Sequence, residues 1–219
     1  MTSEPHRRLS GQIVAATHNS GKLAELRDLL GPHGLEVISA GALGLPEPEE
    51  TGSTFIDNAL IKARSAMRAS RLPSLSDDSG ICVVGLDGEP GIYSARWAGK
   101  SGDFSPAMAR IQTELESRGV AKPWRAYFIS ALAIAWPDGR AETFEGRVDG
   151  DLTFPPRGDA GFGYDPCFVP DGYTRSFGEM TATEKHGLPA DGSLALSHRA
   201  RAFQMLARAC LSPLKDIQN

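Results

Sequence analysis

Short apolar runs alternate with longer amphipathic segments in the first half of this chain, and this alternation restricts the possible folds. Residues 12–16 and 35–38 are apolar runs of strand length, and residues 74–84 carry β-branched side chains typical of a buried strand. Residues 22–30 and 53–70 instead space their apolar side chains as one face of a helix does. A strand, a polar loop and a helix in this order are typical of an α/β unit.

The second half of the chain predicts a hairpin between two helices. Ser105, followed by proline, is a good helix start, and Ser197 is placed to cap a C-terminal helix. Residues 127–136 and 141–148 read as strands that flank a Pro-Asp-Gly turn at 137–139. Parallel units joined to a hairpin predict a mixed sheet flanked by helices.

Composition and charge exclude several classes of protein. The net charge of −4 gives no basic field for nucleic acid or an anionic membrane, so we expect neither partner. The longest apolar stretch, residues 129–136, is much shorter than the ~20 residues of a membrane helix. Three scattered cysteines predict reduced thiols in a cytoplasmic protein.

A polar loop links the first predicted strand to the first predicted helix. Its six residues are Thr17, His18, Asn19, Ser20, Gly21 and Lys22. Amide donors at a helix start, small polar side chains and a lysine favour an anion site. A P-loop is excluded, because Ala16 and Leu23 stand where it needs Gly and Ser or Thr. The alternative is an ordinary turn in which Asn19 and Gly21 serve backbone geometry.

Two acidic clusters are candidates for metal binding and catalysis. Asp77 and Asp78 lie between apolar runs, and adjacent residues of an extended chain point to opposite faces. One of them is therefore a candidate to bind magnesium or activate water, while the other braces the loop. Glu47, Glu49 and Glu50 form an upstream cluster. The alternative is that both clusters are solvated loop charges.

Two further segments are suited to a nucleobase. The loop 161–166 combines glycines, which permit close backbone approach, with aromatic rings that stack on bases. Residues 197–199, Ser-His-Arg, open the last helix with donors that match a keto oxygen. The alternatives are a tight turn with core aromatics and, for Arg199 and Lys185, solvated surface cations.

Six motifs in this order resemble the inosine-triphosphate pyrophosphatase family, and together they cover nearly the whole chain beyond residue 10. They are residues 17–22, 50–55 with Asn58 and Lys62, 76–80, 90–96, 161–166 and 197–199. The resemblance implies an α/β fold with a long mixed sheet, two lobes with a central substrate cleft, and a homodimer. It also implies Mg²⁺-dependent hydrolysis of ITP, dITP and XTP to monophosphate and pyrophosphate, which keeps these nucleotides out of DNA and RNA.

The resemblance also assigns domain boundaries and site residues. It implies a flexible segment over 1–11, one catalytic domain over 12–212 and a tail over 213–219. Asp78 is the implied catalytic residue and, with Glu50, the metal ligand; Glu47 and Glu49 remain alternatives to Glu50. The implied substrate-binding residues are those of the loop 17–22, Lys62, Ser79, Phe162, Gly163, Tyr164, Asp165, Lys185, His198 and Arg199.

One departure and two rival functions accompany the resemblance. Eleven residues, 186–196, separate Lys185 from Ser197 where the family has about three, so Lys185 transfers least directly. A surface loop accommodates such an insertion at little cost. One rival is a septum-inhibitor-type pyrophosphatase acting on pyrimidine or methylated nucleotides. The other is a nucleotide sensor or RNA-binding protein without catalysis. Asp78 acts either as proton acceptor or only as metal ligand, two roles that the residues leave open.

Overall fold

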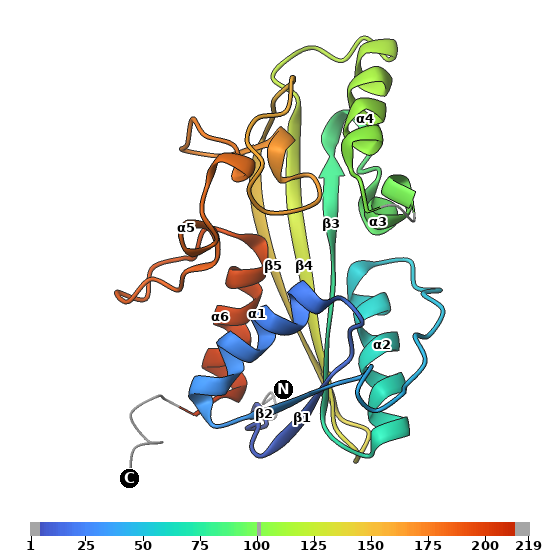
Figure 1. Cartoon of the computed structure of the whole chain (residues 1–219), viewed down its shortest axis with the longest axis vertical. Helices are drawn as coiled ribbons and strands as arrows, with labels where there is room; N and C mark the ends of the chain where they lie inside the picture. Colours follow the sequence, from blue (N-terminus) through green and yellow to red (C-terminus); the bar gives the residue numbers. More distant parts are fainter. Residues whose placement is uncertain (1–4, 100–101, 213–219) are drawn as a thin grey trace. The chain divides into compact units, whose positions relative to one another are not determined.

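The chain folds around a six-stranded mixed sheet, as the sequence predicts, in a computed structural model that describes residues 5–99 and 102–212. The strand order is β2-β1-β3-β4-β5-β6 (Figure 1). Strand β1 runs parallel to β2 and β3, whereas β5 and β6 are antiparallel. The strands are β1 Gln12–Ala15, β2 Glu36–Ser39, β3 Ser74–Val83, β4 Arg125–Ala135, β5 Ala141–Leu152 and β6 Phe168–Pro170.

The longer helices lie where periodicity and capping residues predict them. The α-helices are α1 Ser20–Leu30, α2 Phe55–Ser70, α3 Ser94–Ala98, α4 Ser105–Ser117, α5 Ala182–His186 and α6 His198–Cys210. The predicted hairpin joins β4 to β5 through a turn in which Gly139 N–H donates to the Trp136 carbonyl at 2.9 Å. Helices α3 and α5 and strand β6 are too short to produce a periodic pattern. In the described part of the chain, no helix combines the length and apolar character needed to cross a bilayer.

Two compact units divide the chain. Unit 1 comprises Met1–Asp78, Ala131–Glu145 and Ala202–Asn219, and unit 2 comprises Ser79–Ser130 and Gly146–Arg201. The residues 1–4, 100–101 and 213–219 lie outside the described part, so the expected tail over 213–219 does as well. The boundary falls inside β3, between the consecutive residues Asp78 and Ser79.

Unit 1 covers both faces of its strands with helices. Ile13 packs in a buried cluster with Leu30 of α1 and Phe203 of α6. Its neighbour Val14 packs instead with Ala66 of α2. Because successive strand residues point to opposite faces, α1 and α6 cover one face of β1 and α2 (cyan in Figure 1) covers the other.

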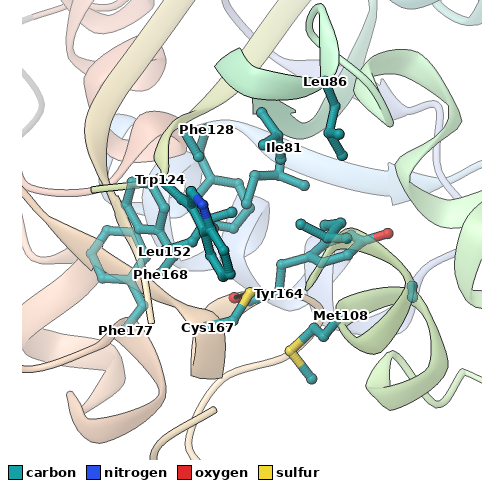
Figure 2. Close-up of a cluster of buried hydrophobic side chains, with 14 of the residues drawn as sticks. Ile81, Leu86, Met108, Trp124, Phe128, Leu152, Tyr164, Cys167, Phe168 and Phe177 are labelled. Atoms are coloured by element: carbon teal, nitrogen blue, oxygen red, sulfur yellow. Dashed lines mark hydrogen bonds between the residues drawn. The ribbon is translucent and has the colours of Figure 1, made fainter. Parts of the chain in front are cut away.

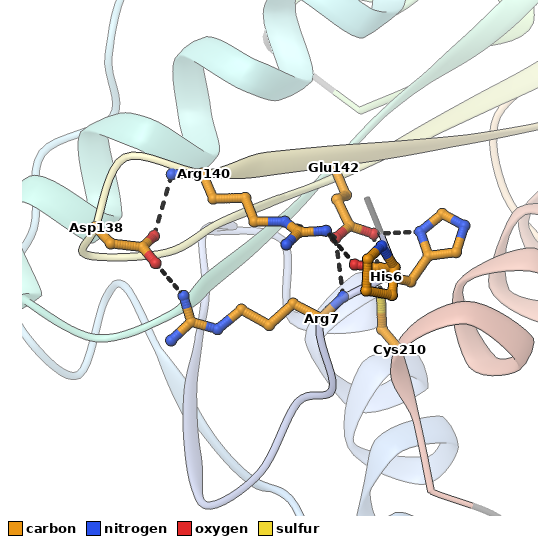
Figure 3. Close-up of polar contacts among 7 residues, drawn as sticks. His6, Arg7, Asp138, Arg140, Glu142 and Cys210 are labelled. Atoms are coloured by element: carbon orange, nitrogen blue, oxygen red, sulfur yellow. Dashed lines mark hydrogen bonds and ion pairs between the residues drawn. The ribbon is translucent and has the colours of Figure 1, made fainter. Parts of the chain in front are cut away.

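The N-terminal segment of unit 1 makes specific contacts from residue 5 onward. Glu142 accepts a hydrogen bond from Arg7 N–H at 3.1 Å and contacts His6 Nδ1 at 2.6 Å (Figure 3). Leu9 is buried, and its N–H donates to the Cys210 carbonyl at 2.7 Å. Within the expected flexible segment 1–11, the described residues are therefore linked to β5 and α6, whereas residues 1–4 lie outside the description.

Unit 2 is built around an aromatic core. Figure 2 shows this cluster, in which Phe128 of β4 meets Phe168 edge-on with ring centroids 4.8 Å apart. Ile111 and Leu115 of α4 are fully buried against it, as the predicted apolar face of that helix requires. The loop that precedes β6 contributes Tyr164 to the same core, and this buried side chain anchors residues 161–166.

Candidate functional site

Unit 1 holds the loop that links β1 to α1. Asn19 caps α1, since its Oδ1 accepts from Lys22 N–H at 3.0 Å, and Thr17 Oγ1 accepts from Asn19 N–H at 3.1 Å. The turn geometry expected of Asn19 is therefore present, and the side chain of Ser20 lies outside the description. Lys22 Nζ lies 2.7 Å from Asp77 Oδ2, which brings the loop's cation to β3.

The two adjacent aspartates of β3 contact different lysines. Asp77 pairs with Lys22 of α1, and Asp78 pairs with Lys62 of α2, each at 2.7 Å. Both aspartates are buried, at 5% and 8% exposure. The separate partners fit the predicted alternation along an extended chain, and the interpretation of these residues as solvated loop charges is wrong.

Helix α2 places Lys62 because its buried face carries polar residues among apolar ones. Thr54 Oγ1 caps the helix by accepting from Asp57 N–H at 3.1 Å. The buried residues are Phe55, Asn58, Ala59, Lys62, Ala63, Ala66 and Met67. The apolar spacing predicts a buried face of Ile56, Ala59, Leu60, Ala63 and Met67; the two larger side chains Ile56 and Leu60 are only half-buried, whereas the other three are buried. Apolar spacing alone gives no weight to a lysine that faces two carboxylates, so it does not predict that Lys62 shares this face.

Asn58 holds the loop that carries Glu47, Glu49 and Glu50, which we term the acidic loop, against α2. Its Oδ1 accepts from Gly52 N–H at 2.8 Å, and a Cβ on Gly52 would lie 2.5 Å from the Asp57 Cβ, so no larger residue fits without a shift. The loop thereby brings Glu50 Oε1 to 2.9 Å from Lys62 Nζ. Of the three candidate glutamates, Glu50 is the one that the structure pairs with this lysine.

A small hollow in unit 1 lies beside this cluster. His18 Nε2 makes a hydrogen bond with the Leu45 carbonyl at 3.0 Å, which closes one side of it. The lining residues include Ala16, His18, Leu45, Glu47, Lys62 and Ala66. His18 and Lys62, both predicted to bind substrate, therefore border the same space, and so does Glu47.

We term Lys22, Lys62, Asp77, Asp78 and Glu50 of unit 1 the acidic cluster. Its carboxylates outnumber its ammonium groups. Lys22 and Lys62 face Asp77, Asp78 and Glu50, so three carboxylates meet two ammonium groups. Burial raises the pKa of Asp78, and the Lys62 charge offsets this only in part. Burial lowers the pKa of Lys62, but Asp78 and Glu50 outweigh it, so the pKa is raised overall and the lysine stays charged.

The carboxylate oxygens of the acidic cluster are suitable ligands for Mg²⁺. Asp78 and Glu50 present carboxylate oxygens to one shared ammonium group. Mg²⁺ is commonly held by one or two carboxylates together with substrate phosphates and water. Within residues 5–99 and 102–212, no group of three His, Cys, Asp or Glu side chains forms a cage for a metal. Asp78 and Glu50 match the carboxylate part of such a site.

Unit 2 holds a second buried ion pair. Asp165 Oδ2 accepts from Lys185 Nζ at 2.7 Å and from Phe162 N–H at 3.0 Å. Gly161 has φ +79°, and a Cβ there would collide with the Asp165 carboxylate and Lys185 Nζ. Glycine is thus required where the loop passes over the pair. Lys185, the least direct of the transferred residues, is firmly placed despite the insertion that follows it.

An exposed ring and a guanidinium lie next to that pair. Phe162 is 54% exposed, and Arg199 Cζ lies 5.8 Å from the centre of its ring. Arg199 Nη2 also donates to Ser79 Oγ at 3.3 Å. We term Phe162, Asp165, Lys185, His198 and Arg199 the base cluster, after the nucleobase that the family resemblance implies for these residues.

Tyr164 lies elsewhere. It is buried in the unit 2 core, and its hydroxyl donates to the Ser94 carbonyl at 2.9 Å. Its ring therefore supports the loop from within the core, whereas Phe162 in the same loop presents an exposed ring.

The start of α6 carries the remaining predicted residues. Ser197 Oγ accepts from Ala200 N–H at 3.2 Å, which confirms the predicted cap. The His198 ring stacks on Phe128 with centroids 4.8 Å apart and planes at 12°. This stacking fixes the imidazole of His198 beside Arg199.

Sequence reasoning gave no role to several residues that hold these clusters. Asn58, quoted only as part of a motif, restrains the acidic loop, and Ser94 Oγ accepts from Ile81 N–H at 3.0 Å. His186 bonds to the cap residue Ser197 at 2.9 Å. The available signal was a polar residue spaced with buried apolar ones, which is clear for Asn58 on α2 and absent for His186 at the end of the five-residue helix α5.

Solved structures with the same fold include HAM1 proteins. A HAM1 protein from Coxiella burnetii superposes with a TM-score of 0.81 at 34% identity, covering 90% of this chain and 96% of that one. The dITP/XTP pyrophosphatase from Mycobacterium abscessus gives 0.69 at 40% identity, covering 83% and 95%. The architecture is therefore an α/β fold of the HAM1 type.

Sequence comparison then gives the family. The Ham1 family model matches residues 13–209. The dITP/XTP pyrophosphatase of Bradyrhizobium diazoefficiens is 62% identical over 210 residues, which cover 95% of this chain and 99% of that protein. The protein of the same name from Brucella melitensis is 54% identical over 208 residues, 92% of this chain and 94% of the relative. This chain belongs to the Ham1 family.

Proposed function

We propose that this protein is a nucleoside-triphosphate pyrophosphatase that hydrolyses ITP, dITP and XTP to the monophosphate and pyrophosphate. In this role it removes non-standard purines before they enter DNA and RNA. The observation that carries the proposal is the acidic cluster, in which Lys62 joins Asp78 to Glu50. Its chain is 62% identical to a relative named dITP/XTP pyrophosphatase.

The acidic cluster is the proposed binding site of the triphosphate group. Lys22 and Lys62 supply positive charge to phosphate oxygens, and Thr17 and Asn19 lie in the loop that presents Lys22. Because carboxylates outnumber these lysines, a triphosphate would be repelled unless a divalent cation entered with it. We propose Mg²⁺ held by Asp78 and Glu50, which would neutralise charge on the departing pyrophosphate.

Asp78 is the proposed proton acceptor. Burial raises its pKa, which brings the carboxylate closer to the basicity that effective proton transfer near neutral pH requires. The water oxygen bonds to a phosphorus, its proton passes to Asp78, and the anhydride bond to pyrophosphate breaks. Lys22 and Lys62 stabilise the charge that develops on the phosphate oxygens. Asp77, paired with Lys22, orients that lysine.

The base cluster is the proposed purine end. Phe162 offers an exposed ring for stacking, and Lys185, His198 and Arg199 supply donors. Inosine and xanthosine present a keto oxygen at the purine 6-position to these donors. Adenine's amino group would leave them unpaired, which is a strong basis for discrimination. Ser79, whose hydroxyl accepts from Arg199, completes this end.

We also propose a cytoplasmic homodimer, as the family resemblance implies. The three cysteines are buried thiols, which fits a reducing compartment. The donor set at the purine end favours a keto purine over the pyrimidine or methylated substrates of the septum-inhibitor type. Within the proposal, the excess carboxylates of the acidic cluster also disfavour RNA as a ligand.

Turnover of a panel of triphosphates, with and without magnesium, tests this proposal. ITP, dITP and XTP should exceed ATP and dTTP in kcat/KM by on the order of 10²-fold or more. The products should be the monophosphate and pyrophosphate in equal amounts. Release of inorganic phosphate, or equal turnover of dTTP and ITP, would refute it.

A further inference from the structure

The inserted segment after Lys185 is closed at its base. Ser197 N–H donates to the Lys185 carbonyl at 3.0 Å, and His186 Nδ1 lies 2.9 Å from Ser197 Oγ. Residues 187–196 therefore form a loop whose two ends are joined side chain to side chain and backbone to backbone. We call the joined residues Lys185, His186 and Ser197 the neck.

The neck touches base-cluster residues on both sides. Lys185 belongs to the buried pair with Asp165, and Ser197 directly precedes His198 and Arg199. Ser197 Oγ also accepts from Ala200 N–H at 3.2 Å, so it caps the helix that carries these two residues. One hydroxyl thus links the cap of α6 to the segment that carries Lys185.

The Ser197 hydroxyl bonds to two groups at the neck. Its oxygen accepts from Ala200 N–H at 3.2 Å and also lies at hydrogen-bond distance from Nδ1 of His186. Burial, followed by the charges of Lys185 and Arg199, lowers the pKa of His186 to about 4 against the opposing effect of Asp165. His186 therefore stays neutral at neutral pH.

The end of the loop 187–196 that precedes Ser197 is also held in place, whereas two leucines of the loop are exposed. The Ala195 carbonyl accepts from Arg201 Nε at 2.8 Å, and Leu196 packs on the unit 2 core. Leu188 and Leu194 are 42% and 65% exposed. The attachment next to Ser197 is thus firm.

We propose that His186 is a positioning residue for purine recognition, closing the neck so that Lys185, His198 and Arg199 are held in one arrangement. This inference rests on the proposed function, because it assigns the base cluster to the purine. The insertion then preserves the base cluster instead of displacing it. His186 affects the binding of the base and not the cleavage of the anhydride.

Substituting His186 separates these two effects. His186→Leu removes the hydrogen-bonding group, whereas His186→Asn places an amide near the position of Nδ1. We expect His186→Leu to raise KM for ITP about five- to tenfold, as loss of one buried hydrogen bond predicts, with kcat within about twofold. Inhibition by inorganic tripolyphosphate, which has no base, should be unchanged. His186→Asn should restore most of the ITP affinity, and His33→Leu, at a histidine outside the neck, should leave both constants unchanged.

A double-mutant cycle with Ser197→Ala measures the coupling directly. Since both residues serve one hydrogen bond, the double variant should be no worse in KM than Ser197→Ala alone. Exchange of the Ala200 amide hydrogen should be faster in His186→Leu, a readout independent of any substrate. Additive effects, an unchanged KM, or an equal loss of tripolyphosphate inhibition would overturn the role of His186. Absence of ITP turnover in the unaltered protein, with normal Ala200 protection, would instead overturn the proposed function alone.

Discussion

Two buried lysine–aspartate pairs of equal length occupy the two units and differ in what surrounds them. Lys62 and Asp78 in unit 1 are 2.7 Å apart, and so are Lys185 and Asp165 in unit 2. In unit 1 a further carboxylate, Glu50, joins the lysine. In unit 2 the neighbours are aromatic and cationic, since the Lys185 ammonium lies 5.9 Å from the Phe177 ring centre.

Under the proposed function, these two similar ion pairs serve different chemistry. Excess carboxylate in unit 1 gives oxygen ligands for a divalent cation and a candidate base. In unit 2 the guanidinium of Arg199 lies beside the exposed ring of Phe162. An ion pair alone does not define a function; the groups that surround it do.

Removal of divalent cations should give the largest effect and should act through unit 1 alone. With excess EDTA, hydrolysis of ITP is expected to fall by on the order of 10³-fold or more, because the carboxylates of the acidic cluster then repel the triphosphate. A coupled pyrophosphate assay measures this, and added Mg²⁺ should restore the rate. Full activity in EDTA would remove the distinction between the two clusters.

Asp165→Asn tests the structural role of the unit 2 pair. It leaves the Lys185 ammonium, 2% exposed, without its carboxylate, so the free energy of unfolding should fall by about 3–5 kcal/mol. Urea unfolding followed by circular dichroism measures this. Asp171→Asn is the matched control, since Asp171 pairs with Arg125 at an exposed site and should cost less than about 1 kcal/mol. Equal losses in the two variants would show that burial of the pair is unimportant.

Lys62→Met sharpens the comparison from the other side. It keeps the aliphatic stem of a residue on the buried face of α2 but removes the ammonium from Asp78 and Glu50. We expect kcat for ITP to fall about 10²-fold, as loss of one charge-stabilising donor predicts. Arg64→Met, on the exposed side of the same helix, is the control and should stay near the unaltered rate. Equal effects would exclude a specific role for Lys62.

The smallest expected effect is a pH dependence of stability from His186. Its pKa is lowered from 6.5 to about 4 in the folded protein by burial and then by Lys185 and Arg199, with Asp165 opposing. Below pH about 6.5 the unfolded chain therefore binds more protons, and stability falls as the pH drops toward 4. Allowing for partial exposure, the loss is on the order of 1 kcal/mol. Urea unfolding at pH 7 and pH 5 should show a smaller difference in His186→Asn; an unchanged difference would contradict the assignment.

Local rules predicted much of the fold and part of the site. Apolar periodicity located the longer helices and most strands, and the extended setting of Asp77 and Asp78 predicted their different partners. Cap chemistry predicted the role of Ser197.

The sequence did not predict features that depend on tertiary contacts. The buried face of α2 includes Lys62 only because carboxylates from β3 and the acidic loop meet it. The Tyr164 ring turned inward because the carbonyl of Ser94, 70 residues away in the chain, accepts its hydroxyl. His186 ends the helix α5, which is too short to produce a periodic pattern, so its bond to Ser197 could not be predicted from the sequence.

The division of labour between the two clusters is tested most directly by one kinetic comparison, in which Asp78→Asn and Arg199→Met are each assayed with ITP and ATP. Asp78→Asn should lower kcat for both nucleotides by about 10²- to 10⁴-fold and leave their kcat/KM ratio unchanged. Arg199→Met should instead reduce that ratio by about tenfold or more. An altered ratio in Asp78→Asn, together with an unaltered ratio in Arg199→Met, would contradict the account.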